Sequence, residues 1–421
     1  MVSHGPRRPR QAGLTMVELM VTMVIAGLVA ASTYAFFAGQ RRVYETQMKV
    51  LNMQQNLWAS IDVMSRYIRM SGAGMLGCVL PDPDGAAVGL GDPPPIGPNP
   101  PQTGLRVFRS VGAPALGTAD YGAAGNAFFV APLWVRNAAT ANGTDELTIA
   151  FGNGAFAKFI DTTLTANVGQ ATDTVQIAAG LDNGYRVGEL FLLIDADGTV
   201  PTTIQRGCTL LSITGIVPGS GVLEHDSAAS WWNPPGNPGG IPFIRPTGYT
   251  TASRAGVRTF GQLFWLRFWI RFLPARPPAL MMTQFSGAQV SQATQVLAEG
   301  IEDMQISYAC DVTDPTGLGA PDGILSEGAP GLTSDEWVNN VAGDSNPLID
   351  TVNRWYRCNS PEAIRLTLIA RTTEREFDVG VTDPDTLIYR RPAAEDNPQG
   401  PLDPFRHRVA TTTIFPRNRN R

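Results

Sequence analysis

Residues 14–38 read LTMVELMVTMVIAGLVAASTYAFFA, and this stretch decides the fold of the chain. Its 25 residues contain a single charged side chain, Glu18, and no proline. That length of apolar sequence is enough for a helix to span a bilayer. A basic stretch at residues 7–10 precedes it, so we expect the N-terminus to stay cytoplasmic and the chain after Arg41 to lie outside.

A cleaved secretory signal peptide is the alternative interpretation of this segment, because Val29, Ala30 and Ala31 resemble a small-residue cleavage site. The position of Glu18 within the apolar run argues against it. A carboxylate inside an apolar helix costs about 2.5–3.5 kcal/mol at mid-membrane, so its presence requires a partner. A free amine is the simplest such partner.

Gly13 to Glu18 read GLTMVE and resemble the processing site of type IV prepilins. The resemblance implies that a prepilin peptidase cuts after Gly13 and that the new N-terminus, Leu14, is methylated. Leu14 stands where this family usually has phenylalanine. Glu18 would then be the fifth residue of the mature chain, and its carboxylate is expected to neutralise the methylated amine of a neighbouring subunit during assembly.

The helical pattern continues beyond the apolar segment. Apolar residues recur at spacings of three, four or seven, as one amphipathic stripe made of Val43, Val50, Leu57, Ile61, Met64 and Ile68. Ser71, Gly72 and Gly74 then end the helix. The pattern predicts one helix from about Leu14 to Met70, with a transmembrane half at 14–38 and an amphipathic continuation at 39–72.

The remainder, residues 73–421, is predicted to be a β-rich head. The chain has 44 glycines and 33 prolines, which predicts long loops, and breaker-rich stretches occur at 81–101, 233–248 and 311–347. The second stretch is a candidate division of the head into two subdomains. Strand-like runs lie between the loops: Glu146 to Phe151, Thr174 to Ala178, Val187 to Ile194, Thr209 to Ile216, Gln262 to Phe272, Glu302 to Ala309, Ala363 to Arg371 and Arg408 to Phe415.

The run at 262–272 alternates most clearly. Its even-numbered residues, Phe264, Leu266, Phe268, Ile270 and Phe272, are expected to face the core. Trp265, Arg267, Trp269 and Arg271 would share the other face, either as a stabilising cross-strand ladder or as a platform for a partner. The pattern as a whole predicts an α+β fold, in which one long N-terminal helix packs on antiparallel sheet.

Several function classes are disfavoured. The net charge of −5 argues against a nucleic-acid binder. The chain has three histidines and shows no catalytic triad spacing, HExxH, nucleophile elbow or phosphate loop, so we expect no enzyme activity and no catalytic residues. Asp195, Asp197 and Gly198 begin like a calcium loop, but the acidic residues that should complete an EF-hand are lacking. Asp311, Asp314 and Asp322 lie in a Gly/Pro-rich loop. Calcium at either stretch is a minor alternative to a polar turn, and no other metal or cofactor is expected.

Four cysteines are far apart in the chain and form no zinc-binding pattern: Cys78, Cys208, Cys310 and Cys358. In an exported protein an even number of isolated cysteines predicts two disulfides, for which three connectivities exist.

Two further stretches resemble PilW-family minor pilins. They are Tyr185 to Leu190, followed by Cys208 and Leu211 to Ile216, and the late segment LAEGIEDMQISY at 297–308, with the run Ile364 to Arg371 after it. The PilW-like layout implies disulfides Cys78–Cys208 and Cys310–Cys358.

The resemblance implies a subunit that primes assembly of a type IV pilus and sits at or near its tip. It also implies partners, namely other minor pilins, the major pilin, the prepilin peptidase and a large tip adhesin. Before assembly the chain would cross the inner membrane once with a periplasmic head, and after assembly it would lie in the pilus.

Two other interpretations stay open. A J-type pseudopilin of a type II secretion system has the same processing site and a similar head. A membrane-anchored periplasmic binding protein would never polymerise, and it predicts an uncut leader and tolerance of Glu18→Ala.

Overall fold

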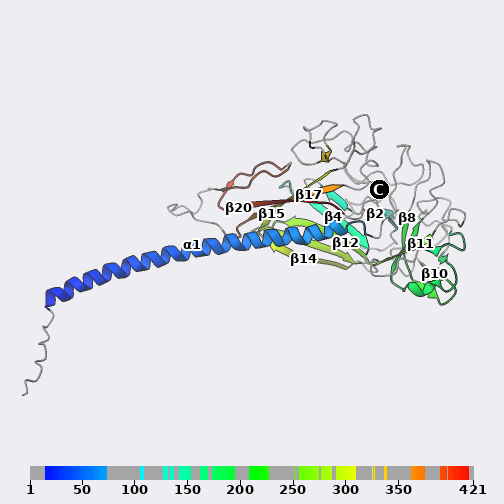
Figure 1. Cartoon of the computed structure of the whole chain (residues 1–421), viewed down its shortest axis with the longest axis horizontal. Coiled ribbons are helices and arrows are strands. Elements are labelled where there is room, and N and C mark those ends of the chain that lie inside the picture. Colours follow the sequence, from blue (N-terminus) through cyan, green and yellow to red (C-terminus); the bar gives the residue numbers. More distant parts are fainter. Residues whose placement is uncertain are drawn as a thin grey trace, which may run out of the picture. The chain divides into compact units, whose positions relative to one another are not determined.

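The computed structural model describes residues 15–73, 105–108, 127–130, 133–136, 142–152, 162–168, 173–194, 208–226, 251, 256–274, 276–286, 291–309, 325, 327, 336–338, 362–374, 389–395 and 397–416 (Figure 1). Its contacts divide the chain into two units, Met1–Asn52 and Met53–Arg421.

Helix α1, Met16–Met70, is a single helix of 55 residues that runs through both units. Within the second unit it buries the predicted stripe, namely Leu57, Ile61, Met64 and Ile68, together with Met53. The stripe does not extend to Val43, which is 50% exposed. Gly72 ends the helix with a left-handed φ of 73°, and its amide donates to the carbonyl of Ala150 at 2.9 Å. The helix therefore ends directly on a strand of the head.

A six-stranded sheet and a three-stranded sheet form one part of the head. The first has the order β2 (Ala127–Val130), β1 (Leu105–Phe108), β8 (Cys208–Ser212), β7 (Leu190–Ile194), β11 (Gly256–Gly261) and β5 (Thr162–Thr163). The second has the order β6 (Thr174–Gln176), β10 (Val222–Glu224) and β9 (Gly215–Val217). Strands β1 and β8 pair in parallel, whereas every other pair between described strands is antiparallel.

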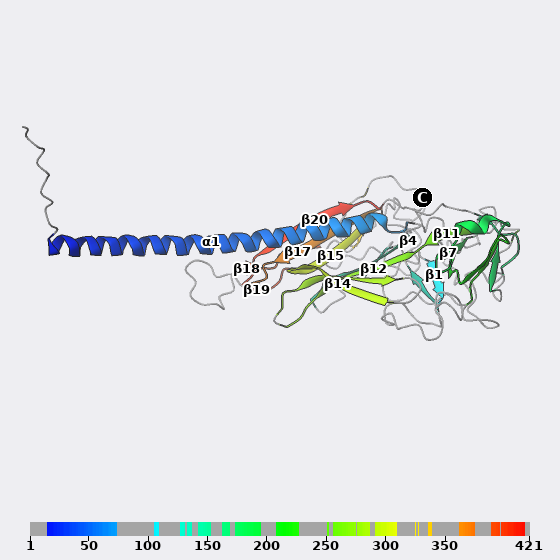
Figure 2. The same cartoon turned by 90° about the horizontal axis from the view of Figure 1, so that it is seen from below.

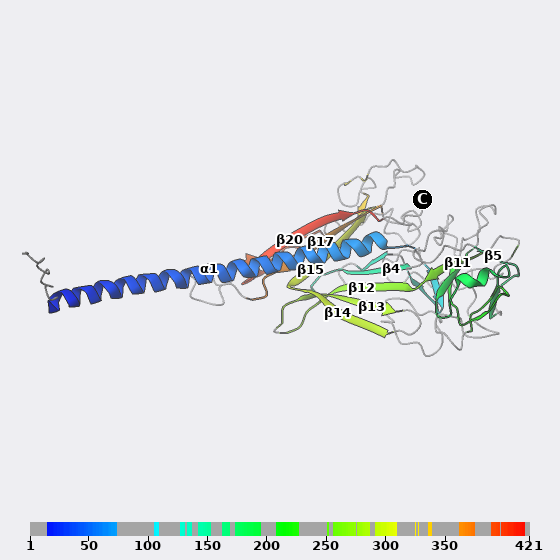
Figure 3. The same cartoon turned by 60° about the horizontal axis from the view of Figure 1, so that its bottom comes forward.

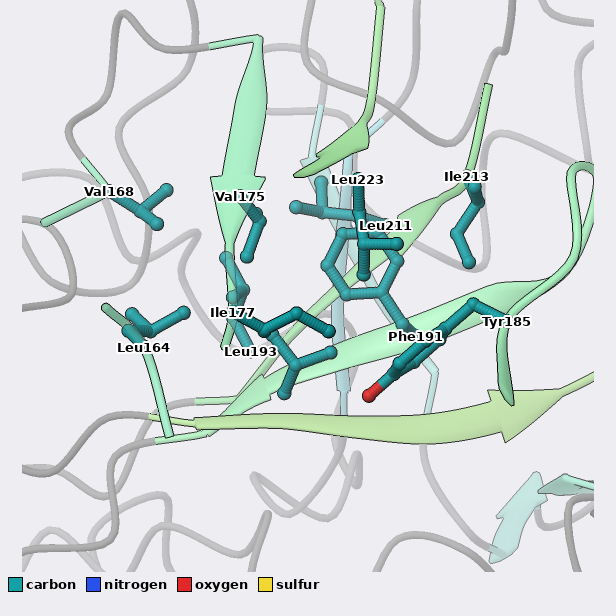
Figure 4. Packing of buried hydrophobic residues seen from close by; sticks show 11 residues of the cluster. Leu164, Val168, Val175, Ile177, Tyr185, Phe191, Leu193, Leu211, Ile213 and Leu223 are labelled. Carbon is teal, nitrogen blue, oxygen red and sulfur yellow. The ribbon is translucent and has the colours of Figure 1, made fainter. Parts of the chain in front are cut away.

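A closed apolar core lies between these two sheets (Figure 4). Phe191 and Leu193 alternate along β7 and point toward the same interior as Leu223 of β10. The short 3-10 helix η2, Leu181–Gly184, leads to Tyr185, which covers the cluster. The remaining members are Leu164, Val168, Val175, Ile177, Leu211, Ile213 and Val257.

A five-stranded sheet holds the alternating run predicted at 262–272. Its order is β14 (Ser291–Glu299), β13 (Ala279–Ser286), β12 (Leu263–Arg271), β4 (Glu146–Gly152) and β3 (Leu133–Arg136). Leu266, Phe268 and Ile270 are buried, as their alternation predicts. Two residues of the run differ from the expectation: Phe272 lies beyond the strand and is exposed, and Trp265 is only 2% exposed although it lies on the opposite face.

The face of β12 that carries Arg267 and Trp269 forms contacts within its own sheet. Arg267 pairs with Glu146 of β4, and its guanidinium lies 5.8 Å from the Trp269 ring centroid. The Trp269 indole donates to Thr283 Oγ1 of β13 at 3.2 Å. These contacts favour the cross-strand ladder over the platform.

A four-stranded sheet completes the head, with the order β16 (Trp337–Val338), β15 (Ile301–Ala309), β17 (Ala363–Arg371) and β20 (His407–Ile414). A two-stranded ribbon pairs β18 (Tyr389–Arg390) with β19 (Leu402–Asp403). Figures 1 and 2 show β15, β17 and β20 alongside the C-terminal turns of α1. Tyr67 of α1 also stacks on Phe151 of β4, with ring centroids 6.2 Å apart. One long helix thus packs on largely antiparallel sheet, and the predicted α+β fold is confirmed (Figure 3).

Gly300 joins β14 of the five-stranded sheet to β15 of the four-stranded sheet. Its φ is +82°, and a Cβ built there would lie 2.7 Å from the carbonyl oxygen of Arg371. Its amide donates to Pro278 O, and its carbonyl accepts from Arg371 N, both at 2.7 Å. Only glycine allows the chain to pass between the sheets this closely.

The loop at 233–248 lies outside the described residues, yet the strands on its two sides pair with one another. Strand β11, which follows the loop, pairs with β7, which precedes it, and β12 pairs with β4. Whether this loop divides two subdomains stays a prediction.

Candidate functional site

The start of α1 is the first candidate site. Gly13 and Leu14, the predicted processing residues, lie outside the described residues, whereas Glu18 lies in the first turn of the helix. The Glu18 carboxylate accepts hydrogen bonds from the Thr15 amide and hydroxyl, both at 3.0 Å. The Glu18 amide donates in return to Thr15 Oγ1 at 3.3 Å. This reciprocal pair is a capping box, and it satisfies backbone donors that the first turn would leave unpaired.

The apolar part of α1 is exposed along its whole length in the single chain. It is long and apolar enough to cross a membrane, and none of that stretch is buried. Its few hydroxyl side chains are satisfied inside the helix: Thr22 donates to Glu18 O at 2.8 Å and Thr33 to Val29 O at 2.7 Å. Glu18 is therefore the only side chain between residues 16 and 38 that brings a charge into this segment.

A second candidate site lies in the motif at 297–308, on β15. All nine residues of this strand are buried, including the adjacent acids Glu302 and Asp303. The pairing of β15 with β17 shifts register between Ile301 and Asp303, so Glu302 is the extra residue of a β-bulge. The bulge places two consecutive carboxylates where each contacts a different segment of the chain.

Asp303 binds the segment around 391–397. Its carboxylate pairs with Arg391 and accepts from Asn397 Nδ2 at 2.9 Å and from Gln305 Nε2 at 2.8 Å. Arg391 also donates to Pro398 O at 2.7 Å. Burial raises the pKa of Asp303 to about 6, and the Gln305 hydrogen bond and the Arg391 charge oppose this only in part. This network fixes the segment before β19 against the four-stranded sheet.

Glu302 contacts the start of β20. His407 Nε2 lies 2.9 Å from Glu302 Oε1 and 3.2 Å from Asp403 Oδ2. Burial lowers the pKa of His407, but its contacts with Asp403 and Glu302, and their charges, outweigh burial and raise that pKa to about 9. Without a bound ion the imidazole is therefore protonated at neutral pH and is paired with two carboxylates.

The other residues singled out in the sequence lie mostly outside the described residues. Cys78, Cys310 and Cys358 are among them, and Cys208 begins β8 without a described side chain. Both disulfides therefore stay predictions. The two acidic stretches considered for calcium, beginning at Asp195 and Asp311, lie outside as well.

Sequence reasoning missed two features of these sites. The capping box was readable from Thr15 and Glu18, because Thr-x-x-Glu before an apolar run is its signature. The grouping of Glu302 with Asp403 and His407 had no local signal, since a bulge and strand pairing bring together residues about 100 positions apart in the chain.

Comparisons with known families match two parts of the chain. Residues 267–418 match the family described as type IV pilus-assembly protein W, PilW. Residues 8–34 match the prokaryotic N-terminal methylation motif. No curated protein and no solved structure matches the chain. The first match covers β12 to β20 and includes the motif at 297–308, and the second covers Gly13, Leu14 and Glu18.

Proposed function

We propose that this chain is a PilW-type minor pilin that primes assembly of a type IV pilus and sits at or near its tip. The matches to the PilW family over residues 267–418 and to the N-terminal methylation motif over residues 8–34 support this. In this proposal the prepilin peptidase cuts after Gly13, and Leu14 receives the N-methyl group. The partners are other minor pilins, the major pilin and a large tip adhesin. The subunit waits in the inner membrane with its head in the periplasm and then enters the pilus.

The exposed apolar half of α1 is the observation that carries the proposal. Large apolar side chains are exposed there throughout, from Met16 at 76% to Phe37 at 64%. Such a surface is unstable in water and requires either lipid or the helices of neighbouring subunits. A pilin meets both requirements in turn, because the subunit first lies in the bilayer and then enters a filament core made of the same kind of helix.

The presence of Glu18 distinguishes an assembling subunit from a simple membrane anchor. An anchor gains nothing from a carboxylate that costs about 2.5–3.5 kcal/mol in the bilayer. In a filament the same carboxylate pairs with the methylated amine of Leu14 from the next subunit, so that two charges are neutralised together. This supports polymerisation as the role of the segment.

The part of the head outside the PilW match supports a role specific to this subunit. The match begins at residue 267, after all strands of the six-stranded and three-stranded sheets. We therefore expect these two sheets and their loops to recognise the terminal partner, whereas strands β12 to β20, which the match covers from residue 267 on, belong to the shared scaffold. The family role is pilus assembly, and the absence of enzyme activity stays a prediction.

Mass spectrometry of the N-terminal peptide tests the proposal. The peptide is sought in two fractions, sheared surface filaments and cell membranes. A peptide that begins at methylated Leu14 in the filaments is the expected result. An uncut leader in both fractions, or cleavage near Ala31, would refute it and favour an anchored or secreted protein.

The same two fractions distinguish the type II secretion pseudopilin. A methylated Leu14 peptide found in membranes but absent from surface filaments favours a pseudopilin. Gold-labelled antibody against the head then tests the tip: label at filament ends supports it, and label distributed along the filaments contradicts it.

A further inference from the structure

Glu302, Asp403 and His407 come from three different segments, yet their ligand atoms all lie within 4.8 Å of one another. We propose that these three side chains form a binding site for one divalent transition-metal ion, zinc in the first place, which clips the start of β20 to β15. The inference rests on the head alone and is independent of the pilus role.

The buried ends of these side chains lack hydrogen bonds. The His407 and Glu302 side chains are 4% and 8% exposed. Both ring nitrogens of His407 and Glu302 Oε1 are buried and have no well-aligned hydrogen-bond partner. Nε2 lies close to two carboxylate oxygens, but neither contact forms an aligned hydrogen bond. Polar atoms buried in this way are costly unless a further group satisfies them.

The distances within the cluster are slightly shorter than those between ligands of one metal ion. Zinc lies about 2.0–2.2 Å from imidazole nitrogen and carboxylate oxygen, so two ligands of a tetrahedral ion are themselves about 3.3–3.6 Å apart. The distances from His407 Nε2 are 2.9 Å to Glu302 and 3.2 Å to Asp403. A small movement of these side chains around an ion is enough to complete the site.

The remaining oxygen atoms of both carboxylates already have other roles. Asp403 Oδ1 accepts from the amide of Phe405 at 2.9 Å, which leaves Oδ2 for the cluster. Glu302 Oε2 lies 3.9 Å from Arg371 Nε, which leaves Oε1 toward His407. The Arg371 guanidinium stacks on the Phe405 ring at 4.1 Å. The surrounding residues therefore orient one oxygen of each carboxylate toward the same point, as outer partners of metal ligands do.

The kinds of ligand favour zinc over calcium or magnesium. One imidazole and two carboxylates suit zinc and its neighbours in the first transition series, whereas calcium and magnesium take oxygen ligands. Three protein ligands leave a fourth position for water in a tetrahedral site. Asp403 is 23% exposed, so an ion reaches the site from that side.

Zinc titration of the full-length, tag-free chain in detergent micelles tests the site. The chain is treated with a chelator, the chelator is removed, and zinc chloride is titrated by calorimetry. We expect one saturable site per chain and a higher unfolding temperature when zinc is present. Cobalt in place of zinc should give visible absorption bands of a low-symmetry site with mixed nitrogen and oxygen ligands.

Two variants locate the ion. Asp403→Asn keeps the oxygen that accepts from Phe405 and should weaken zinc binding by about tenfold or more, and His407→Gln should abolish it. His225→Leu, which changes the other described histidine, should leave binding unchanged. A wild-type chain without saturable binding would overturn the proposal, as would binding that survives both Asp403→Asn and His407→Gln in folded protein.

Discussion

The N-terminal half of α1 and strand β15 each contain a carboxylate in apolar surroundings, but the two carboxylates differ in their partners. In α1 the carboxylate of Glu18 lies in an exposed apolar segment, and its described contacts are to Thr15 and its own helix. In β15 the carboxylate of Asp303 is fully buried, and Arg391, Asn397 and Gln305 of the same head satisfy it. The Asp303 carboxylate is therefore satisfied within one chain, whereas in the proposed filament the Glu18 carboxylate is neutralised by another subunit. Assembly should depend on the first region and folding on the second.

The largest effect should come from Glu18→Ala. Without the carboxylate, the methylated amine of the neighbouring subunit is unpaired in an apolar core, at a cost of about 2.5–3.5 kcal/mol. We expect the amount of this protein in sheared filaments to fall about 100-fold, because each 1.4 kcal/mol is a factor of ten. The amount in membranes should stay unchanged in the same immunoblots.

Glu45→Ala is the matched control, because Glu45 is also on α1 and pairs with Arg41 at an exposed position. Its level in filaments should equal that of the wild type. Normal incorporation of the Glu18→Ala protein would contradict the comparison and favour an anchored protein.

Asp303→Ala should lower the stability of the folded head, in contrast to Glu18→Ala, which should impair assembly. It removes the carboxylate that pairs with Arg391, and breaking a buried ion pair costs about 3–5 kcal/mol. Denaturant unfolding of the full-length chain in detergent micelles should measure this loss. Asp62→Ala removes an exposed helix pair with Arg66 and should change stability by less than about 0.5 kcal/mol. Equal effects of the two substitutions would show that burial is not what makes the Asp303 network matter.

His225 should make the stability of the head depend on pH in the acidic range. Burial lowers its pKa from 6.5 to about 4, so the unfolded chain binds its proton at a higher pH than the folded chain does. Its contribution to stability is therefore full above pH 6.5 and falls as pH decreases from 6.5 toward 4, by about 3 kcal/mol in total.

The difference between wild type and His225→Leu across pH 4–7 isolates this contribution. Asp303 has the opposite effect on stability in this range, because its raised pKa adds stability as pH falls from 6 to 3.8. Both proteins contain Asp303, so its contribution cancels in the difference. A difference that stays constant with pH would show that His225 does not titrate as its burial requires.

The smallest effect should come from Thr15→Ala. This change removes the hydroxyl of the capping box but leaves the Glu18 carboxylate in place. Loss of such a cap costs about 1 kcal/mol, so amides of the first turn of α1 should exchange with deuterium about fivefold faster. Incorporation into filaments should change far less than in the Glu18→Ala protein. A loss as large as that of Glu18→Ala would mean that the cap itself is needed for assembly.

The sequence predicted the regular parts of the fold well, since their periodicity is local. Helix α1 was expected to end at about Met70, where it does end, and β12, β15, β17 and β20 lie within a residue or two of the expected runs. Trp265 was not predicted to be buried, because alternation places it on the same face as Arg267 and Trp269, and its burial depends on the surrounding fold rather than on the local pattern.

The candidate sites also differ in how far the sequence predicts them. The place of Glu18 at the start of α1 was predictable because it depends on local sequence, whereas its role in assembly stays a prediction. The contacts of Glu302 and Asp303 were not predictable, because they depend on a bulge of one residue and on a turn that follows β19. A single shift in register would have placed either carboxylate on the other face.

The pairing of β4 with β12 has a consequence for how the chain folds as it is made. β4 ends at Gly152 and its partner begins at Leu263, and strands β5 to β11 of two other sheets lie between them in the chain. When the N-terminal part of the chain has been secreted, one edge of β4 therefore stays unpaired until roughly 110 more residues have been secreted. Such contacts between distant residues form slowly, and open edges invite pairing with the wrong strand. We expect the nascent head to need a periplasmic chaperone that covers this edge until β12 emerges.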